Sequence, residues 1–173
     1  MILQPIDSLQ RTRVLTATED FLQRASELFD FRCEPLTVSF DLKGRAAGQY
    51  RVDRNGRTIR YNPYLFARYF QDNLENTVPH EVAHYVVDRL YGVHRVRAHG
   101  AEWKRVMCLF GASPRATANY DMTGIPVRRQ QRFPYRCNCR EHSLTSIRHN
   151  RIINNRAIYR CRACRSSLVF AGL

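Results

Sequence analysis

Apolar residues recur every three or four positions between residues 8 and 29, which is the longest regular pattern in the chain. This spacing places them on one face of an α-helix. The face consists of Leu9, Val14, Leu15, Ala17, Phe21, Leu22, Ala25, Leu28 and Phe29. The pattern predicts one long amphipathic helix over residues 8–29.

Apolar and polar residues alternate in three segments that follow, at residues 36–41, 48–52 and 58–61. Alternation with a period of two is typical of strands that bury one face. Asn55-Gly56 lies between the second and third segments, and this dipeptide is a strong signal for a hairpin turn. We therefore predict three short antiparallel strands.

Helical spacing returns after residue 77, with apolar residues at Val78, Val82, Ala83, Val86, Val87 and Leu90. Pro79 suits a first helical turn, with Asn76 or Thr77 as the N-cap, and Gly92 suits the end of the helix. We expect a core helix here, and we expect the helix of residues 8–29 to pack against it.

Two further helices are expected, one from about Pro63 to about Asp72 and one over residues 101–110. The second has core-spaced residues at Trp103, Val106, Met107 and Phe110. Residues 111–126 show little periodicity and form a linker, or a loop packed on the domain. Tyr120 and Asp121 in this loop are expected to pack, although a tyrosine near a catalytic cleft is able to steady an oxyanion.

The predicted helices and short strands indicate an α+β protein. A length of 173 residues allows one ordinary domain and a small appendage, and a hydrophobic fraction of 44% supports a sizeable core. We place the domains at residues 1–125 and 126–173. No apolar run approaches the roughly 20 residues that span a bilayer, and the N-terminus lacks a basic lead-in to a long apolar stretch. We therefore expect no membrane partner and a cytoplasmic location.

Positive charge is concentrated in the second of these domains. Residues 126–173 contain eleven arginines, one glutamate and no lysine, so they carry 11 − 1 = +10 of the total charge of +13. Arginine favours bidentate phosphate contacts and stacking on bases. The alternative is that these arginines only form a solvated surface. An excess of positive charge of this size on fewer than fifty residues favours nucleic acid as a partner.

The clearest candidate for catalytic chemistry is the motif His80-Glu81-Val82-Ala83-His84. On a helix, residues i and i+4 share a face, so His80 and His84 are able to hold one Zn²⁺ together. Glu81 flanks that face, where a carboxylate reaches a water molecule without being a ligand. The alternative is a buried helix with hydrogen-bonded histidines.

A third ligand has to come from downstream, where the candidates are Asp88, His94, His99 and Glu102. Asp88 is one turn beyond His84 and is better placed to accept a hydrogen bond or to carry surface charge. His94 follows the predicted helix end too closely for the chain to return to the metal. We favour His99, with an N-terminal capping role or a pairing with Glu102 as its alternatives.

Four cysteines form two close pairs, which predict a second metal site. They are Cys137, Cys139, Cys161 and Cys164. Residues 148–159 lie between the pairs and alternate like a hairpin, as in a zinc ribbon with two knuckles. Because C-x-C is tighter than the usual C-x-x-C, His142 is an alternative to Cys137 or Cys139, although we favour four cysteines. Disulfides fit poorly because nothing marks the chain as secreted, and the other two cysteines, Cys33 and Cys108, are expected to be packing residues.

The order His80-Glu81-x-x-His84 and then His99-Gly100-x-x-Trp103-Lys104 resembles the SprT family, whose eukaryotic relatives are the Spartan proteases that degrade proteins crosslinked to DNA. The chain length, the segment 133–137 and the cysteine-bearing tail are also similar to bacterial SprT. The resemblance implies a helical zincin-like metalloprotease core with a small antiparallel sheet, followed by a zinc ribbon. It further implies that His80, His84 and His99 bind the catalytic zinc and that Glu81 is the general base.

These observations together predict a zinc metallopeptidase that hydrolyses DNA-associated or DNA-crosslinked proteins. Its expected cofactors are one catalytic and one structural zinc ion, and its expected partner is DNA, single-stranded or at junctions. The alternative is a non-proteolytic zinc-containing protein that binds nucleic acid or has a regulatory role. Glu81 argues against it, because a structural site has no need of an acid beside its first ligand. A zinc nuclease is less favoured, since the extra carboxylates of a two-metal site are missing.

Overall fold

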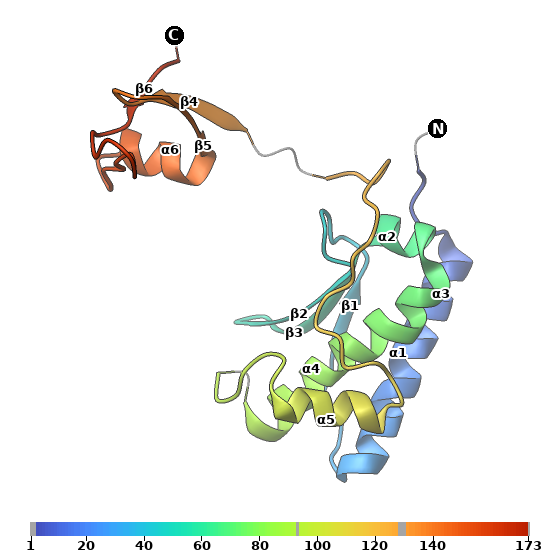
Figure 1. Cartoon of the computed structure of the whole chain (residues 1–173). Coiled ribbons are helices and arrows are strands. Elements are labelled where there is room, and N and C mark those ends of the chain that lie inside the picture. The colour runs from blue at the N-terminus through green and yellow to red at the C-terminus, as the bar shows by residue number, and fades with distance from the viewer. Residues whose placement is uncertain (1–2, 93, 128–130, 173) are drawn as a thin grey trace. The chain divides into compact units, whose positions relative to one another are not determined.

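The computed structural model of the chain describes residues 3–92, 94–127 and 131–172. It consists of two compact units, residues 1–127 and residues 128–173, and each is described by itself below (Figure 1). We call them the N-terminal unit and the C-terminal unit. No helix within the described ranges combines the length and the apolar character that crossing a bilayer requires.

The N-terminal unit begins with helix α1, Ser8–Phe29, which has the bounds that the apolar pattern predicts. A capping box fixes its start: Asp7 accepts from the N–H of Gln10 at 2.8 Å, and the Gln10 side chain accepts from the N–H of Asp7 at 3.1 Å. Its apolar face packs on helix α4, Val78–Tyr91, as expected.

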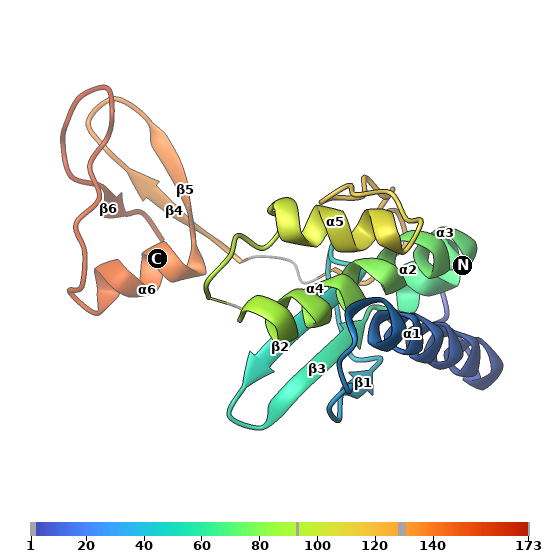
Figure 2. The same ribbon diagram turned by 90° about the horizontal axis from the view of Figure 1, so that it is seen from below.

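A three-stranded sheet covers another side of α4 and consists of β1 (Thr37–Ser39), β2 (Gly48–Asp53) and β3 (Gly56–Tyr61). The strands β2 and β3 form the hairpin predicted at Asn55-Gly56, where Gly56 has a φ of 112°. The strand order is β1-β3-β2, so β2 is an edge strand. Figure 2 shows α4 lying between these strands and helix α5, Ala101–Leu109.

The prediction that all three strands are antiparallel is wrong, because β1 runs parallel to β3. The reason lies in residues 40–47, which carry the chain from one edge of β3 to the other. The side chain of Asn62 holds this connection by donating to the carbonyl groups of Gly44 and Ala46, at 3.0 and 3.2 Å. An alternating pattern indicates a strand, but it contains no information about the direction of its neighbour.

The helix expected between Pro63 and Asp72 is broken. It forms α2 (Pro63–Arg68) and α3 (Phe70–Asp72), separated at Tyr69, which has φ −128° and ψ 50°. A π-helical turn, η1 (Asn73–Thr77), then runs directly into α4.

Thr77 occupies the N-cap position of α4 without capping it, because its hydroxyl donates to the side chain of Asn73 at 2.7 Å. Pro79 lies in the first turn of α4, and Gly92 with a φ of 87° ends the helix, as predicted.

The core of the unit centres on α4, where Val78, Val82, Ala83 and Val86 are fully buried. Trp103, Val106 and Met107 of α5 pack into the same core. Cys33 is half-buried beside the core, but the packing role predicted for Cys108 is wrong, since Cys108 is exposed. It lies on the outer face of α5, while Val106 and Met107 take the inner face.

Residues 111–127, which we call the strap, contain no helix or strand and pack on the rest of the N-terminal unit. Arg68 pairs with Asp121 at 2.7 Å and also donates to the carbonyl of Thr123. The interpretation of this segment as a packed loop is therefore confirmed.

The C-terminal unit contains a second sheet, with β4 (Arg132–Arg136) between β5 (Glu141–Thr145) and β6 (Val169–Phe170), all antiparallel. The hairpin expected at residues 148–159 is wrong, because Ser146–Ile153 forms helix α6. Helical spacing turns His149 toward the sheet, where its ring stacks on Phe133 at 3.7 Å and its Nδ1 lies 3.0 Å from the hydroxyl of Tyr135. The apolar residues Ile153 and Ile158 of this span are exposed, so the alternation does not indicate burial.

Candidate metal centre

Three histidines meet at one point in the N-terminal unit. His80 and His84 lie one turn apart on α4, and His99 lies just before α5. Their Nε2 atoms are 3.1–3.2 Å from one another. In a tetrahedral zinc site with Zn–N distances of 2.0–2.1 Å, ligand nitrogens lie roughly 3.3 Å apart. The three imidazoles therefore fit a single zinc ion.

The other candidates for a third ligand lie elsewhere. Asp88 is buried and accepts hydrogen bonds from Tyr50 and Arg57, both at 2.7 Å. His94 is exposed, and Glu102 lies in the first turn of α5. Among the described residues, His99 is the one that joins His80 and His84 in a group of possible metal ligands.

Burial keeps the three imidazoles neutral, which is the form that binds metals. Burial and the neighbouring His99 lower the pKa of His80 to about 4. Burial, His80 and His99 lower the pKa of His84 to about 3. Burial also lowers the pKa of His99.

Two contacts orient the imidazole rings. A backbone hydrogen bond to Arg115 of the strap raises the pKa of His80 slightly against these effects, as expected when a ring N–H donates to a carbonyl. Trp103 is fully buried, and its ring centroid lies 4.7 Å from that of His80, 5.7 Å from that of His84 and 4.8 Å from that of His99. Its Nε1 donates to the carbonyl of His80 at 3.3 Å. Contacts of this kind fix ligand orientation.

A cavity of about 890 Å³ adjoins the histidines and is lined by both His80 and Glu81. Its other walls come from residues 45–48 before and at the start of β2, from Tyr69 and Asp72 at the broken helix, and from the strap. Tyr120 of the strap stacks on Tyr69 at 4.6 Å, and its hydroxyl donates to Asp72. Tyr120 thus lines the cavity but packs as the sequence suggests.

Glu81 is 5% exposed and lies against the edge strand β2. Burial raises the pKa of its carboxyl group to about 8, while a hydrogen bond from the backbone of Tyr50 acts in the opposite direction. Its carboxylate is absent from the histidine group of possible ligands, so it is available for proton transfer beside the cavity.

The four cysteines of the C-terminal unit also come together, with their sulfur atoms within 4.8 Å of one another. The Sγ of Cys139 lies 3.5 Å from that of Cys137 and 3.7 Å from that of Cys161. A disulfide requires about 2.05 Å, whereas sulfur atoms bound to one zinc at 2.3 Å lie roughly 3.8 Å apart. The cluster therefore fits a metal ion and contains no disulfide.

Backbone hydrogen bonds favour the metal-binding form of one of these thiols, that of Cys161. Backbone hydrogen bonds from Cys164 and Ala163 lower the pKa of Cys161, which favours the thiolate that metals bind. His142 lies 3.2 Å from the Sγ of Cys137 through its Nε2, but it is outside the group of four. The structure thus brings together the four cysteines that the sequence analysis favours.

Some residues of the histidine site were not identified from the sequence. Gly48 and Tyr50 were assigned only to a strand, and Trp103 was assigned to the core and to the family motif without a role at the metal. The backbone contact from Arg115 has no sequence signal, since any residue supplies a carbonyl group.

Comparisons of this chain with known proteins point to the SprT-like family. The sequence model of the SprT-like family matches residues 18–130. Protein SprT of Vibrio parahaemolyticus is 36% identical over 155 residues, which cover 89% of this chain and 90% of that protein. Protein SprT of Pseudomonas paraeruginosa is 38% identical over 163 residues, covering 91% and 94%. No solved structure matches the chain significantly.

Proposed function

Because the chain belongs to the SprT-like family, we propose that it is a zinc-dependent metallopeptidase acting on proteins that are bound or crosslinked to DNA. One observation carries the proposal. The Nε2 atoms of His80, His84 and His99 lie 3.1–3.2 Å apart, beside a cavity that Glu81 also lines.

The proposed chemistry divides between the metal and the chain. Zinc bound by three neutral imidazoles would supply a Lewis acid that polarises a peptide carbonyl. Glu81 takes a proton from the attacking water and returns it to the leaving amine, which needs that proton to depart. Burial raises the pKa of Glu81, and the positive charge of a zinc ion bound beside it would act in the opposite direction, toward the ionised carboxylate that accepts a proton.

The C-terminal unit is proposed to hold a structural zinc ion at its four cysteines and to bind DNA. All nine arginines in its described part are exposed, and the described ion pairs involve none of them. Glu141 is the single acid of this unit. A DNA-binding unit raises the effective concentration of DNA-bound proteins at the cavity, which favours those substrates without a selective side-chain pocket.

The test compares wild type with Glu81→Gln for zinc content, DNA binding and cleavage of a DNA-bound protein. Glu81→Gln is expected to keep zinc and DNA binding and to lose cleavage, because the amide cannot accept the proton. Glu102→Gln is a matched control, since this glutamate follows His99 by three residues but lies outside the ligand group. It is expected to cleave like wild type.

The DNA requirement is tested by adding single-stranded or duplex DNA to the same assay. Faster cleavage in the presence of DNA supports the DNA-directed substrate choice, and equal rates with and without DNA contradict it. If wild type binds zinc and DNA but cleaves nothing under any of these conditions, the non-proteolytic alternative replaces the peptidase.

A further inference from the structure

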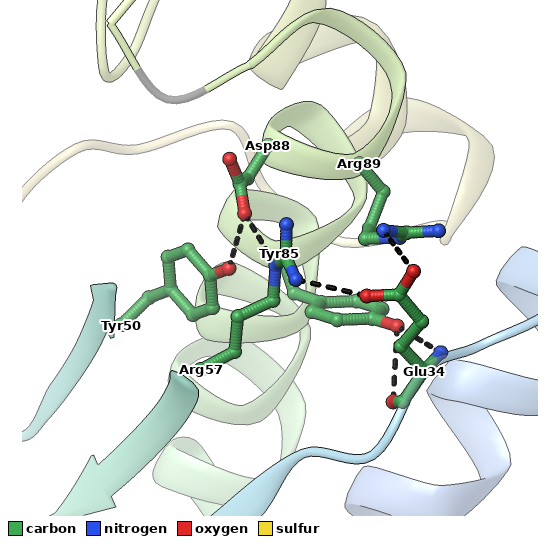
Figure 3. Close-up of polar contacts among 6 residues, drawn as sticks. All are labelled: Glu34, Tyr50, Arg57, Tyr85, Asp88 and Arg89. Carbon is green, nitrogen blue, oxygen red and sulfur yellow. Dashed lines mark hydrogen bonds and ion pairs between the residues drawn. The ribbon is translucent and has the colours of Figure 1, made fainter. Parts of the chain in front are cut away.

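The side chain of Glu81 lies on the face of α4 that packs on the sheet. Glu81, Tyr85 and Asp88 recur at positions i, i+4 and i+7, so they share one face of the helix. Gly48 and Tyr50 occupy positions i and i+2 of β2, so they share the strand face that meets α4. Figure 3 shows Tyr50 reaching from β2 to Asp88 on this helix.

Gly48 provides the space in which the Glu81 carboxylate lies. A Cβ atom added at Gly48 would be 2.5 Å from Oε1 of Glu81, 2.6 Å from its Cγ and 2.8 Å from its Cδ. Carbon atoms pack at about 3.5–4.0 Å, so a methyl group at this position excludes the carboxylate. The backbone of Gly48 has no positive φ, and therefore an alanine fits the strand itself.

Tyr50 fastens β2 to α4 at two points. Its backbone forms a hydrogen bond with the Glu81 carboxylate. Two helical turns further along, its hydroxyl donates to Oδ2 of Asp88 at 2.7 Å. Arg57 of β3 donates to the same oxygen at 2.7 Å, which anchors Asp88 to the hairpin (Figure 3).

We propose that Gly48 and Tyr50 are positioning residues for Glu81, Gly48 by leaving room for its carboxylate and Tyr50 by fixing the distance between β2 and α4. This inference rests on the proposed peptidase function. It assigns the position of the general base to the edge strand, while the histidines depend on α4, Trp103 and the strap.

The experiment uses full-length zinc-loaded protein with three variants: Gly48→Ala, Tyr50→Phe and Gln49→Ala. Gln49 alternates to the opposite face of β2 and is exposed, so Gln49→Ala is the matched control. Each variant is measured for zinc content, for kcat and KM with the DNA-bound protein substrate of the preceding test, and by crystallography for the position of Glu81.

Gly48→Ala is expected to fold, to keep its zinc content and to move the Glu81 carboxylate by about 1 Å, the distance that restores normal packing contacts. A misplacement of this size lowers kcat by about 100-fold, with KM nearly unchanged. Tyr50→Phe adds no bulk and is expected to lower kcat about tenfold through the lost hydrogen bond to a charged group. Gln49→Ala is expected to match wild type in all measurements.

An unmoved Glu81 carboxylate in folded Gly48→Ala overturns the inference, and so does an unchanged kcat in Tyr50→Phe. If Gly48→Ala does not fold, Tyr50→Phe alone decides the outcome in the same way. Loss of zinc in either variant also contradicts a role confined to Glu81. If wild type has no peptidase activity, the proposed function fails, and the position of Glu81 in the Gly48→Ala crystal still decides the structural part.

Discussion

Replacement of Asp88 by alanine is expected to destabilise the N-terminal unit by about 3 kcal/mol. The side chain of Asp88 is 6% exposed and accepts from Arg57 and from Tyr50, each at 2.7 Å (Figure 3). Its loss removes one of the two carboxylate partners of the Arg57 guanidinium and the acceptor of the Tyr50 hydroxyl. The perturbation therefore removes one partner of a buried, hydrogen-bonded ion pair.

The magnitude follows from the two groups left behind. Removing one partner of a fully buried pair costs about 3–5 kcal/mol. Arg57 is 27% exposed and keeps its ion pair with Glu34 at 2.9 Å, so the loss of its pairing with Asp88 accounts for about 2 kcal/mol of the destabilisation. The half-buried hydroxyl of Tyr50 adds about 1 kcal/mol for its lost acceptor.

Asp41→Ala is the matched control. Asp41 also pairs with an arginine, since Arg60 lies 2.9 Å away, but its side chain is 60% exposed. Exposed ion pairs of this kind contribute about 0–1 kcal/mol to the free energy of unfolding. The two variants thus each remove a carboxylate that pairs with an arginine of β3, and the two ion pairs differ in burial.

The assay is urea unfolding followed by the fluorescence of Trp103, which is the single tryptophan of the chain and reports on the N-terminal unit. Both variants are compared with wild type at one zinc concentration, because a bound ligand adds to the apparent stability. If Asp88→Ala lowers the free energy of unfolding by no more than Asp41→Ala does, burial does not determine how much these ion pairs contribute to stability, and the prediction is refuted.

Three other predictions concern the metal sites. Binding of Co²⁺ to the histidines is expected to quench the fluorescence of Trp103, because the centroid of its ring lies 4.7 Å from that of His80. Titration of zinc-free protein with Co²⁺ measures this quenching. Zinc affinity at this site is expected to be nearly constant around neutral pH and to fall in acid, because the pKa values of all three imidazoles are lowered and protonation of any one of them removes a ligand. Competition with a chromophoric chelator at each pH measures this affinity. Replacing Cys161 and Cys164 by serine is expected to reduce zinc from two ions per chain to one, measured by atomic absorption, and an unchanged content would exclude the cysteine site.

The parts of the fold predicted correctly depend on local patterns. Helix α1 was predicted with its observed bounds because a long helix repeats its apolar spacing many times. The hairpin at Asn55-Gly56 and the helix end at Gly92 follow from backbone conformations that those residues favour. Each signal lies within a few residues of the feature that it predicts.

The incorrect parts depend on contacts between distant segments. The direction of β1 is set by the connection that Asn62 holds, some twenty residues beyond the strand. The break at Tyr69 places its ring against Tyr120 of the strap, and α6 replaces a hairpin because His149 stacks on Phe133. Alternation and helical spacing describe burial along one element, and they do not identify the element that covers it.

The distinction between local patterns and contacts of distant segments also applies to the histidine site, where it separates the histidines from Glu81. His80 and His84 were identified from the sequence because one helix fixes their spacing, whatever packs around it. The position of Glu81 depends on Gly48, which is thirty-three residues earlier and carries no side chain to attract notice. On the proposed function, a chain with the same histidine motif and a bulkier residue at position 48 is therefore expected to bind zinc and to fail in hydrolysis, because the motif would specify the ligands while the edge strand would specify where the proposed base lies.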